Sequence, residues 1–130
     1  MKKIFLLAIA IFMVSNIANA CSGITIKGQS GKSYCLSKSP MNWYSAYTWC
    51  QAQGKHLINL DTVCGKSTGY CTELTLSSDE KNNIQENGGV AGMAWTDNSV
   101  ASNIAFWVSV MNGQIATRLR DDANYYALCN

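Results

Sequence analysis

The sequence predicts an α+β domain in which two short helices pack on small antiparallel sheets and disulfide bonds staple the chain. All six cysteines lie at or after position 21, and an even number of cysteines in a short exported chain predicts a disulfide framework. A helical pattern runs over 42–54, and alternating apolar residues over 93–130 predict several strands. Helices followed by a set of short strands are typical of an α+β arrangement.

Residues 1–20 have the pattern of a secretory signal peptide. Lys2 and Lys3 supply its positive end, residues 4–14 its apolar middle, and Ala18-Asn19-Ala20 fits an A-x-A cleavage site. The apolar run is short for a bilayer span and no second run follows, so no transmembrane segment is expected. We therefore expect one domain over 21–130 that is secreted or periplasmic.

Cys21 follows the expected cleavage site directly, which is also the position at which bacterial lipoproteins are acylated. That signal has Leu three residues before the cysteine, where this chain has Ala18. Lipidation through Cys21 is therefore the alternative to a disulfide at this residue, and it would leave one of the six cysteines unpaired.

The charge of the domain is balanced. The whole chain has 10 Lys and Arg against 8 Asp and Glu, and removal of Lys2 and Lys3 leaves eight against eight. Nucleic-acid-binding domains carry a basic stripe or patch, and this sequence has none. We therefore expect no nucleic-acid partner.

The first helix is expected over 42–54. Asn42 is its N-cap and Gly54 allows it to end. Four residues fall at the i, i+3, i+4 and i+7 positions of the buried face: Trp43, Ala46, Tyr47 and Cys50. Trp49 lies off this stripe, so it is expected to be partly exposed or to cover the N-terminal hairpin.

A second helix is expected to begin at Ser77, because Ser77 and Glu80 have the spacing of a capping box. Ile84 is its main inward anchor and Gly88-Gly89 ends it. The expected strands alternate in hydrophobicity and lie at 22–27, 32–37, 93–96, 105–111, 114–120 and 124–129. The first two form a hairpin that places Cys21 and Cys35 opposite one another.

Turns separate the later strands. Residues 99–103 are expected to form a polar loop, and Asn112-Gly113 predicts a type I′ hairpin turn, in which both central residues take positive φ. Asp121-Asp122 is expected to form a turn, with the alternative that its carboxylates contribute oxygen ligands to a hard cation.

Cys64 and Cys71 form a C-x6-C spacing, which suits either a local disulfide or half of a zinc site. Zinc needs further ligands nearby, and His56 is the only histidine. We therefore expect a Cys64–Cys71 disulfide and no metal. With the cysteines paired, no Ser–His–acid or Cys–His arrangement is available, so the chain is not expected to be an enzyme.

The pattern W-x2-A-x3-C-x3-G-x2-L, present as Trp43, Ala46, Cys50, Gly54 and Leu57, resembles the first helix and following turn of the C-type lectin-like domain. The resemblance spans residues 21–130 and implies a C-type lectin-like fold. It implies that Cys50 pairs with Cys129 on the last strand. It also implies a disulfide-closed N-terminal hairpin, here Cys21–Cys35 beside Tyr34.

The chain departs from the sugar-binding members of this family, which hold Ca²⁺ with a Glu-Pro-Asn or Gln-Pro-Asp tripeptide. Pro40 is the only proline and lies before the first helix, so this tripeptide is absent. These members also bind Ca²⁺ with a Trp-Asn-Asp motif on a later strand. Trp95-Thr96-Asp97-Asn98 resembles this motif, but it lies too far before Cys129 for the family's spacing. The chain looks like a compact bacterial version for which no cofactor is expected, with calcium as the alternative although its family motif is absent.

Trp95 and the polar run 96–103 are the candidate binding residues. An apolar ring beside hydrogen-bonding side chains is typical of carbohydrate or protein recognition, so the candidate ligand-binding residues are Trp95, Asp97, Asn98 and Asn103. The alternative is that Trp95 belongs to the core. The expected function is a non-enzymatic recognition or adhesion module for a glycan or protein surface. The alternative is a structural or assembly subunit of a surface appendage or envelope complex.

Overall fold

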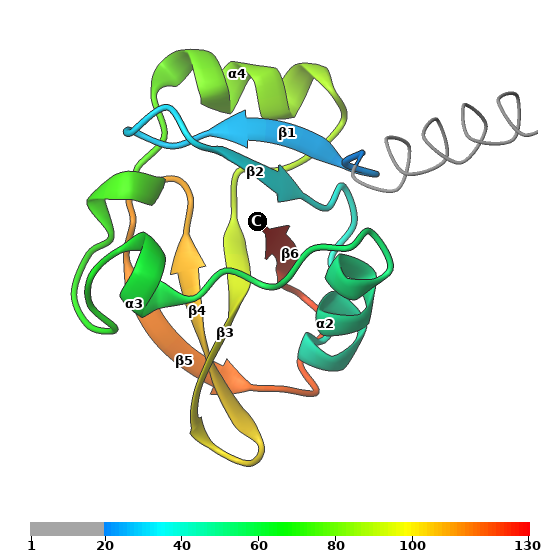
Figure 1. Ribbon diagram of the computed structural model, residues 1–130, viewed down its shortest axis with the longest axis vertical. Coiled ribbons are helices and arrows are strands. Elements are labelled where there is room, and N and C mark those ends of the chain that lie inside the picture. Colours follow the sequence, from blue (N-terminus) through cyan, green and yellow to red (C-terminus); the bar gives the residue numbers. More distant parts are fainter. Residues whose placement is uncertain (1–19) are drawn as a thin grey trace, which may run out of the picture.

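The computed structural model describes residues 20–130, so the expected signal peptide lies outside the described residues except for Ala20. The described chain is an α+β domain built on one six-stranded mixed sheet (Figure 1). Its helices are α2 (Trp43–Gln51), α3 (Leu60–Val63), the short 3₁₀ helix η1 (Thr72–Leu74) and α4 (Ser78–Glu86). Its strands are β1 (Ile24–Lys27), β2 (Ser33–Leu36), β3 (Met93–Ala101), β4 (Ile104–Ser109), β5 (Ile115–Leu119) and β6 (Tyr126–Cys129).

The strands lie in the order β1-β2-β6-β3-β4-β5. Neighbours are antiparallel except β3 and β6, which pair in parallel through Ala94–Tyr126 and Trp95–Ala127. The expectation of small antiparallel sheets is therefore wrong for this pair, and the sheet is mixed. Strand β5 runs in the same direction as β3, and the segment 120–125 then carries the chain back toward the start of β3. Strand β6 therefore enters the middle of the sheet in the same direction as β3. Alternation in a sequence shows that a strand is present, but not which strand will be its neighbour.

The core has two parts, one on each face of the sheet. Ala94 and Leu128 contribute to a cluster with Ile84 of α4, while Trp95 and Ala127 contribute to a cluster with Trp43 and Cys50 of α2. Successive side chains of a strand point to opposite faces, so β3 and β6 each supply both clusters. In Figure 1, α4 lies across β1 at one end of the domain and α2 lies beside β6.

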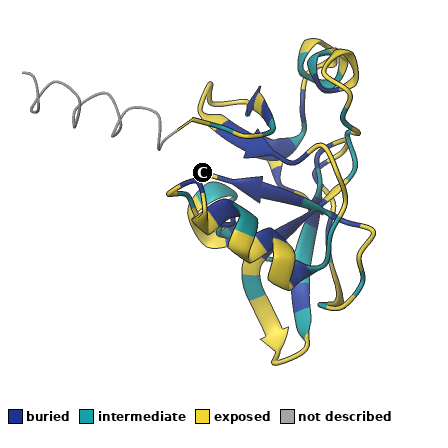
Figure 2. Cartoon of the chain, turned by 90° about the vertical axis from the view of Figure 1, so that its right-hand side faces the viewer, coloured by how far each residue is buried: buried dark blue, intermediate teal, exposed yellow. Residues whose placement is uncertain are grey.

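Helix α2 forms where it was expected. The Ser45 backbone N–H donates to the Asn42 side chain at 2.9 Å, and Trp43, Ala46 and Cys50 are buried. Tyr47, expected on the buried face, is instead 37% exposed. Its ring stacks on the Trp43 ring at the margin of the buried stripe, with centroids 5.3 Å apart. The outward side of α2 is exposed in Figure 2.

The turns differ most from the sequence-based expectations. The loop expected over 99–103 is shorter, because β3 continues to Ala101 and only residues 102–103 form the turn before β4 begins at Ile104. The β3–β4 pair has register irregularities. Asn112-Gly113 does not form a type I′ turn, since Gly113 has φ 78° but no described non-glycine residue has positive φ. The Cys71 backbone N–H donates to the Gly113 carbonyl at 2.7 Å. Contact with the preceding loop therefore shapes this turn.

Three disulfides join Cys21 to Cys35, Cys50 to Cys129 and Cys64 to Cys71, and these are the pairs expected above. Within 20–130 no cysteine is free. None of the helices in this part of the chain is long and apolar enough to cross a membrane. Cys50–Cys129 ties α2 to the last strand, which stabilises the position of the helix against the sheet.

Candidate functional site

Trp95 is fully buried, so its expected role as a ligand platform is not compatible with this structure. Its indole N–H donates to the Met41 carbonyl at 2.9 Å, and its ring packs against Tyr125 with centroids 4.9 Å apart. The alternative expectation, a core tryptophan, describes its position. Because neighbouring side chains of a strand point to opposite faces, Ala94 lies on one face of the sheet and Trp95 on the other. There Trp95 belongs to the core cluster that contains Trp43 and Cys50, which we call the α2 cluster.

Asn98 connects two elements of the fold. Its side-chain oxygen accepts from the Leu60 backbone N–H at 2.7 Å, and its amide nitrogen donates to Asp61 at 3.4 Å. It therefore ties β3 to the start of α3. Asp97 and Asn103 expose their side chains on the hairpin. Of the four candidate residues, only Asp97 and Asn103 have exposed side chains that form no hydrogen bond within residues 20–130.

Arg120 joins this hairpin to α2, and the sequence analysis did not identify it. Its guanidinium carbon lies 3.9 Å from the centroid of the Trp43 ring, and it donates to the Ser99 hydroxyl. Its backbone N–H donates to the Asn103 carbonyl at 2.8 Å. The Trp43 indole N–H in turn donates to the Thr96 carbonyl at 2.8 Å. Trp43 is thus held on two sides by the β3–β4 hairpin and by Arg120.

The outer side of α2 is an aromatic surface supported by this framework. Tyr44 is 51% exposed and meets the Trp43 ring edge-on at 5.5 Å. Tyr47 stacks on the same ring, and its hydroxyl accepts from the Gln51 side chain at 2.9 Å. Both tyrosines are therefore oriented by contacts within the helix, which reduces the entropy that a ligand would have to remove on binding.

An open, shallow groove of about 560 Å³ lies along this helix, and we call it the α2 groove. Its lining is Met41, Tyr44, Ser45, Thr48, Trp49 and Ala52. No charged residue occurs over 39–54, so the groove and its rims combine aromatic rings with hydroxyl and amide groups. The signal that could have found it is the pair of aromatic residues, Tyr44 and Trp49, that lie off the buried stripe of the helix.

A polar cluster around Glu73 lies elsewhere, between η1 and the first hairpin. The Glu73 carboxylate accepts from the Ser30 backbone N–H and from the Tyr34 hydroxyl, each at 2.7 Å. Burial acts to raise the pKa of Glu73, but the hydrogen bonds from Ser30 and Tyr34 outweigh it and hold the pKa below its usual value. Burial, reinforced by Glu73, raises the pKa of Tyr34 well above its usual value. The carboxylate acts here as a structural tie.

Within 20–130 no group of three or more His, Cys, Asp or Glu residues is placed to hold a metal ion. Asp122 forms an ion pair with Arg118 at 2.6 Å and accepts from the Asn124 backbone at 3.0 Å. The Arg118 hydrogen bond lowers the pKa of Asp122. Asp122 therefore has the turn role that the sequence suggested.

The comparisons with known proteins assign neither a family nor a function to this chain. No protein-family model matches the chain, and no curated protein matches it significantly.

Proposed function

We propose that this protein is an exported, non-enzymatic recognition module that binds a glycan or protein surface through the α2 groove and the neighbouring Tyr47, without obligate calcium. The observation that carries the proposal is the rigid, uncharged aromatic surface of α2. Tyr44 and Tyr47 are exposed there, although their rings are held by Trp43. Large exposed aromatic groups on a small domain are typical of interaction sites.

The chemistry of this surface favours an uncharged ligand. Aromatic rings offer an apolar platform while their hydroxyl groups form hydrogen bonds. Ser45 and Thr48 in the groove add neutral hydrogen-bonding groups. None of the residues that line the groove is charged, so the lining itself offers no counter-charge to an acidic sugar or a charged peptide. Neutral glycans are therefore the first ligand class to test.

We further propose that the domain has a C-type lectin-like fold. Four motif residues, Trp43, Ala46, Cys50 and Leu57, are buried in a single cluster, which supports a shared framework role. Gly54 has φ 70°, as expected where a helix ends in a left-handed residue. Three disulfides in one small domain support an oxidising compartment, so we place the protein outside the cell or in the periplasm.

The test is a glycan array probed with the purified 21–130 chain, with and without EDTA. We expect binding to neutral glycans that EDTA does not abolish. Tyr44→Ala should weaken it by roughly 5- to 30-fold, which corresponds to about 1–2 kcal/mol. Tyr70→Ala is the matched control, because Tyr70 is 58% exposed but lies outside the α2 groove.

Each outcome decides between recognition classes. Equal losses of glycan affinity in Tyr44→Ala and Tyr70→Ala would show that the α2 groove is not the binding site. Binding that EDTA abolishes would contradict the calcium-independent mode. If no glycan is bound, co-purification with envelope proteins distinguishes protein recognition or an assembly role from glycan recognition.

A further inference from the structure

Two of the three disulfides lie side by side in the sheet. Cys35 on β2 and Cys129 on β6 are direct cross-strand partners in the antiparallel pair, yet each is bonded to a different cysteine. Directly opposed residues of an antiparallel pair have Cα atoms about 4.5–5.5 Å apart. Disulfides span Cα separations of about 4.4–6.8 Å. Cys35 and Cys129 therefore have backbone positions suited to a disulfide of their own.

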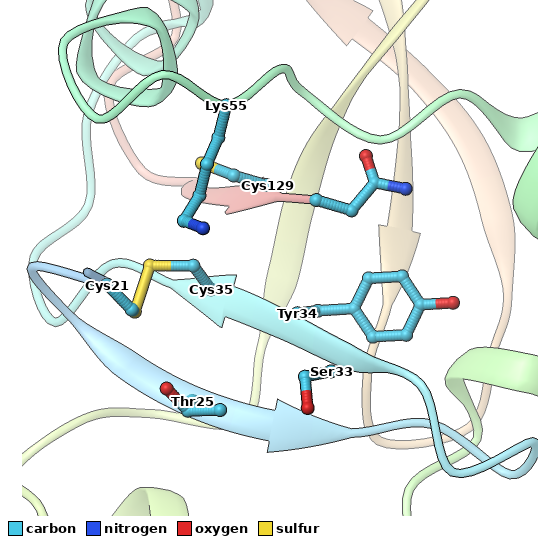
Figure 3. Close-up of a pocket in the computed structure, with 8 residues that line it drawn as sticks. Cys21, Thr25, Ser33, Tyr34, Cys35, Lys55 and Cys129 are labelled. Carbon is cyan, nitrogen blue, oxygen red and sulfur yellow. A yellow bond between two sulfur atoms is a disulfide. The ribbon is translucent and has the colours of Figure 1, made fainter. Parts of the chain in front are cut away.

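The four cysteines share one environment. Cys35, Cys50 and Cys129 belong to the α2 cluster, and Cys21 packs against it. A cavity of about 250 Å³ is lined by Cys21, Cys35 and Cys129 together with Lys55, whose side chain extends toward the disulfides in Figure 3. A cation near a thiol favours its reactive thiolate form.

Access differs between the two bonds. Cys21 is partly exposed, whereas Cys35 is 2% exposed and both Cys50 and Cys129 are fully buried. A thiol from solvent therefore reaches the sulfur of Cys21 before any other sulfur of the pair. Attack at Cys21 makes Cys35 the leaving group, and this releases a thiolate directly opposite Cys129.

We propose that Cys21–Cys35 and Cys50–Cys129 form a thiol–disulfide exchange site, in which an external thiol converts them to a Cys35–Cys129 disulfide. The thiolate of the external thiol bonds to Cys21 Sγ, and the Cys21–Cys35 bond breaks with its electron pair on Cys35. The Cys35 thiolate then bonds to Cys129 Sγ, and the Cys50–Cys129 bond breaks with its electron pair on Cys50. Cys50 takes up the proton that the external thiol lost.

The exchange replaces two intrachain disulfides with one, Cys35–Cys129, and a mixed disulfide between Cys21 and the external thiol. Helix α2 loses its covalent link to β6, and β2 becomes linked to β6 instead. Cys64–Cys71 takes no part, because both residues lie with the other core cluster. Loop-closure entropy depends weakly on loop length, so moving the bond from Cys50–Cys129 to Cys35–Cys129 changes this cost little.

The test uses the full 21–130 domain in which Cys21 of the Cys21–Cys35 disulfide is replaced. Cys21→Ser leaves Cys35 without its partner. After incubation at about pH 8.5, where an ordinary thiol is half ionised, acid quenching, alkylation and peptide mapping locate the free thiol. We expect a Cys35–Cys129 peptide and alkylation of Cys50 within roughly tenfold of that of Cys35, since the two loops have similar closure entropies.

Alkylation confined to Cys35, with Cys50–Cys129 intact, would overturn the proposal. Cys64→Ser is the matched control, because it frees Cys71 away from the site, and its label should stay on Cys71. Scrambling in this control equal to that in Cys21→Ser would also overturn the proposal, because exchange would then be general.

A measurement on the unchanged chain covers the case in which a cysteine variant does not fold. Treatment with limiting glutathione should give a product that carries glutathione on Cys21, a Cys35–Cys129 bond and a free Cys50. A product with glutathione on Cys21 and a free Cys35, but no Cys35–Cys129 bond, would contradict the exchange.

Discussion

Tyr34 on β2 donates its hydroxyl hydrogen to the Glu73 carboxylate at 2.7 Å, across 39 residues of sequence. The same carboxylate accepts from Ser30 in the first hairpin turn, and the Glu73 carbonyl accepts from the Gln29 backbone at 3.0 Å. A Cβ at Gly28 would lie 2.6 Å from the carboxyl carbon of Glu73. One acidic residue therefore fixes the turn of the N-terminal hairpin against η1.

Tyr34→Phe should lower the free energy of unfolding by about 1–2 kcal/mol, because it removes one hydrogen bond to a charged acceptor while keeping the buried ring. Urea unfolding measures this change. Tyr126→Phe is the control, since Tyr126 is only partly buried and no hydrogen bond of its hydroxyl is found among residues 20–130. It should change stability by less than about 0.5 kcal/mol. Equal effects of the two variants would contradict the role given to the Tyr34 hydroxyl.

The lowered pKa of Glu73 predicts a pH-dependent contribution to stability. Because the folded pKa lies below the unfolded value of about 4.3, the unfolded state binds the proton more tightly. The contribution is thus fully present above the unfolded pKa and is lost as pH falls through the folded pKa. Urea titrations of wild type and Glu73→Gln should differ most near neutral pH, and the difference should shrink in acid. A constant difference would show that the carboxylate charge does not contribute.

Helices α2 and α4 were accessible from the sequence because local capping signals specify them, whereas α3 and η1 were not expected. The Cys50–Cys129 pair followed from the family resemblance rather than from a local signal. Asn42 and Ser77 cap helices where they were expected, and each accepts a backbone N–H near the helix start. The parallel pairing of β6 with β3 was not accessible, because it depends on where the segment 120–125 returns. Likewise, no local pattern shows that the Gly113 turn must fit against Cys71.

Asn98 should be important for stability rather than for binding. Asn98→Ala removes the acceptor for the Leu60 backbone N–H, which belongs to a fully buried residue, so a loss of about 1–3 kcal/mol is expected. Asp97→Ala and Asn103→Ala change exposed side chains and should alter stability by less than about 0.5 kcal/mol. Thermal or urea unfolding of the three variants separates these roles. If Asn98→Ala leaves the stability unchanged, Asn98 does not stabilise the connection between β3 and α3.

The two disulfides outside the N-terminal hairpin should contribute unequally. Cys50–Cys129 closes a separation of 79 residues and Cys64–Cys71 one of 7. In the loop-entropy model these correspond to about 4–5 and about 2–3 kcal/mol. The double variant Cys50→Ala/Cys129→Ala should therefore be less stable than Cys64→Ala/Cys71→Ala by about 2 kcal/mol, measured by urea unfolding. The reverse order would indicate that contacts of the 64–71 loop outweigh chain entropy.

The candidate site was only partly accessible from the sequence, for a physical reason. Trp95 and the polar residues after it have the composition of a binding loop, but the sheet turns Trp95 inward and uses Asn98 as a tie. The exposed aromatic surface comes from α2, where Tyr44 lies off the buried stripe. Arg120 escaped notice because its contact with Trp43 joins segments far apart in the chain.

Arg120 should stabilise the junction between α2 and the β3–β4 hairpin through its contact with Trp43. Arg120→Met keeps much of the side-chain length but removes the charge above the ring and the hydrogen bond to the Ser99 hydroxyl. A cation over a tryptophan ring contributes about 0.5–2 kcal/mol depending on its desolvation, and a loss in this range is expected in urea unfolding.

Arg118→Met is the matched control, because Arg118 forms an exposed ion pair with Asp122, and solvent screening leaves such pairs little effect on stability. Near-UV circular dichroism supplies a second readout, since it reports the packing of Trp43 and its stacked tyrosines. Arg120→Met should change this spectrum and Arg118→Met should leave it nearly unchanged. If Arg120→Met alters neither the spectrum nor the stability, Trp43 is held by the Thr96 carbonyl and the helix alone.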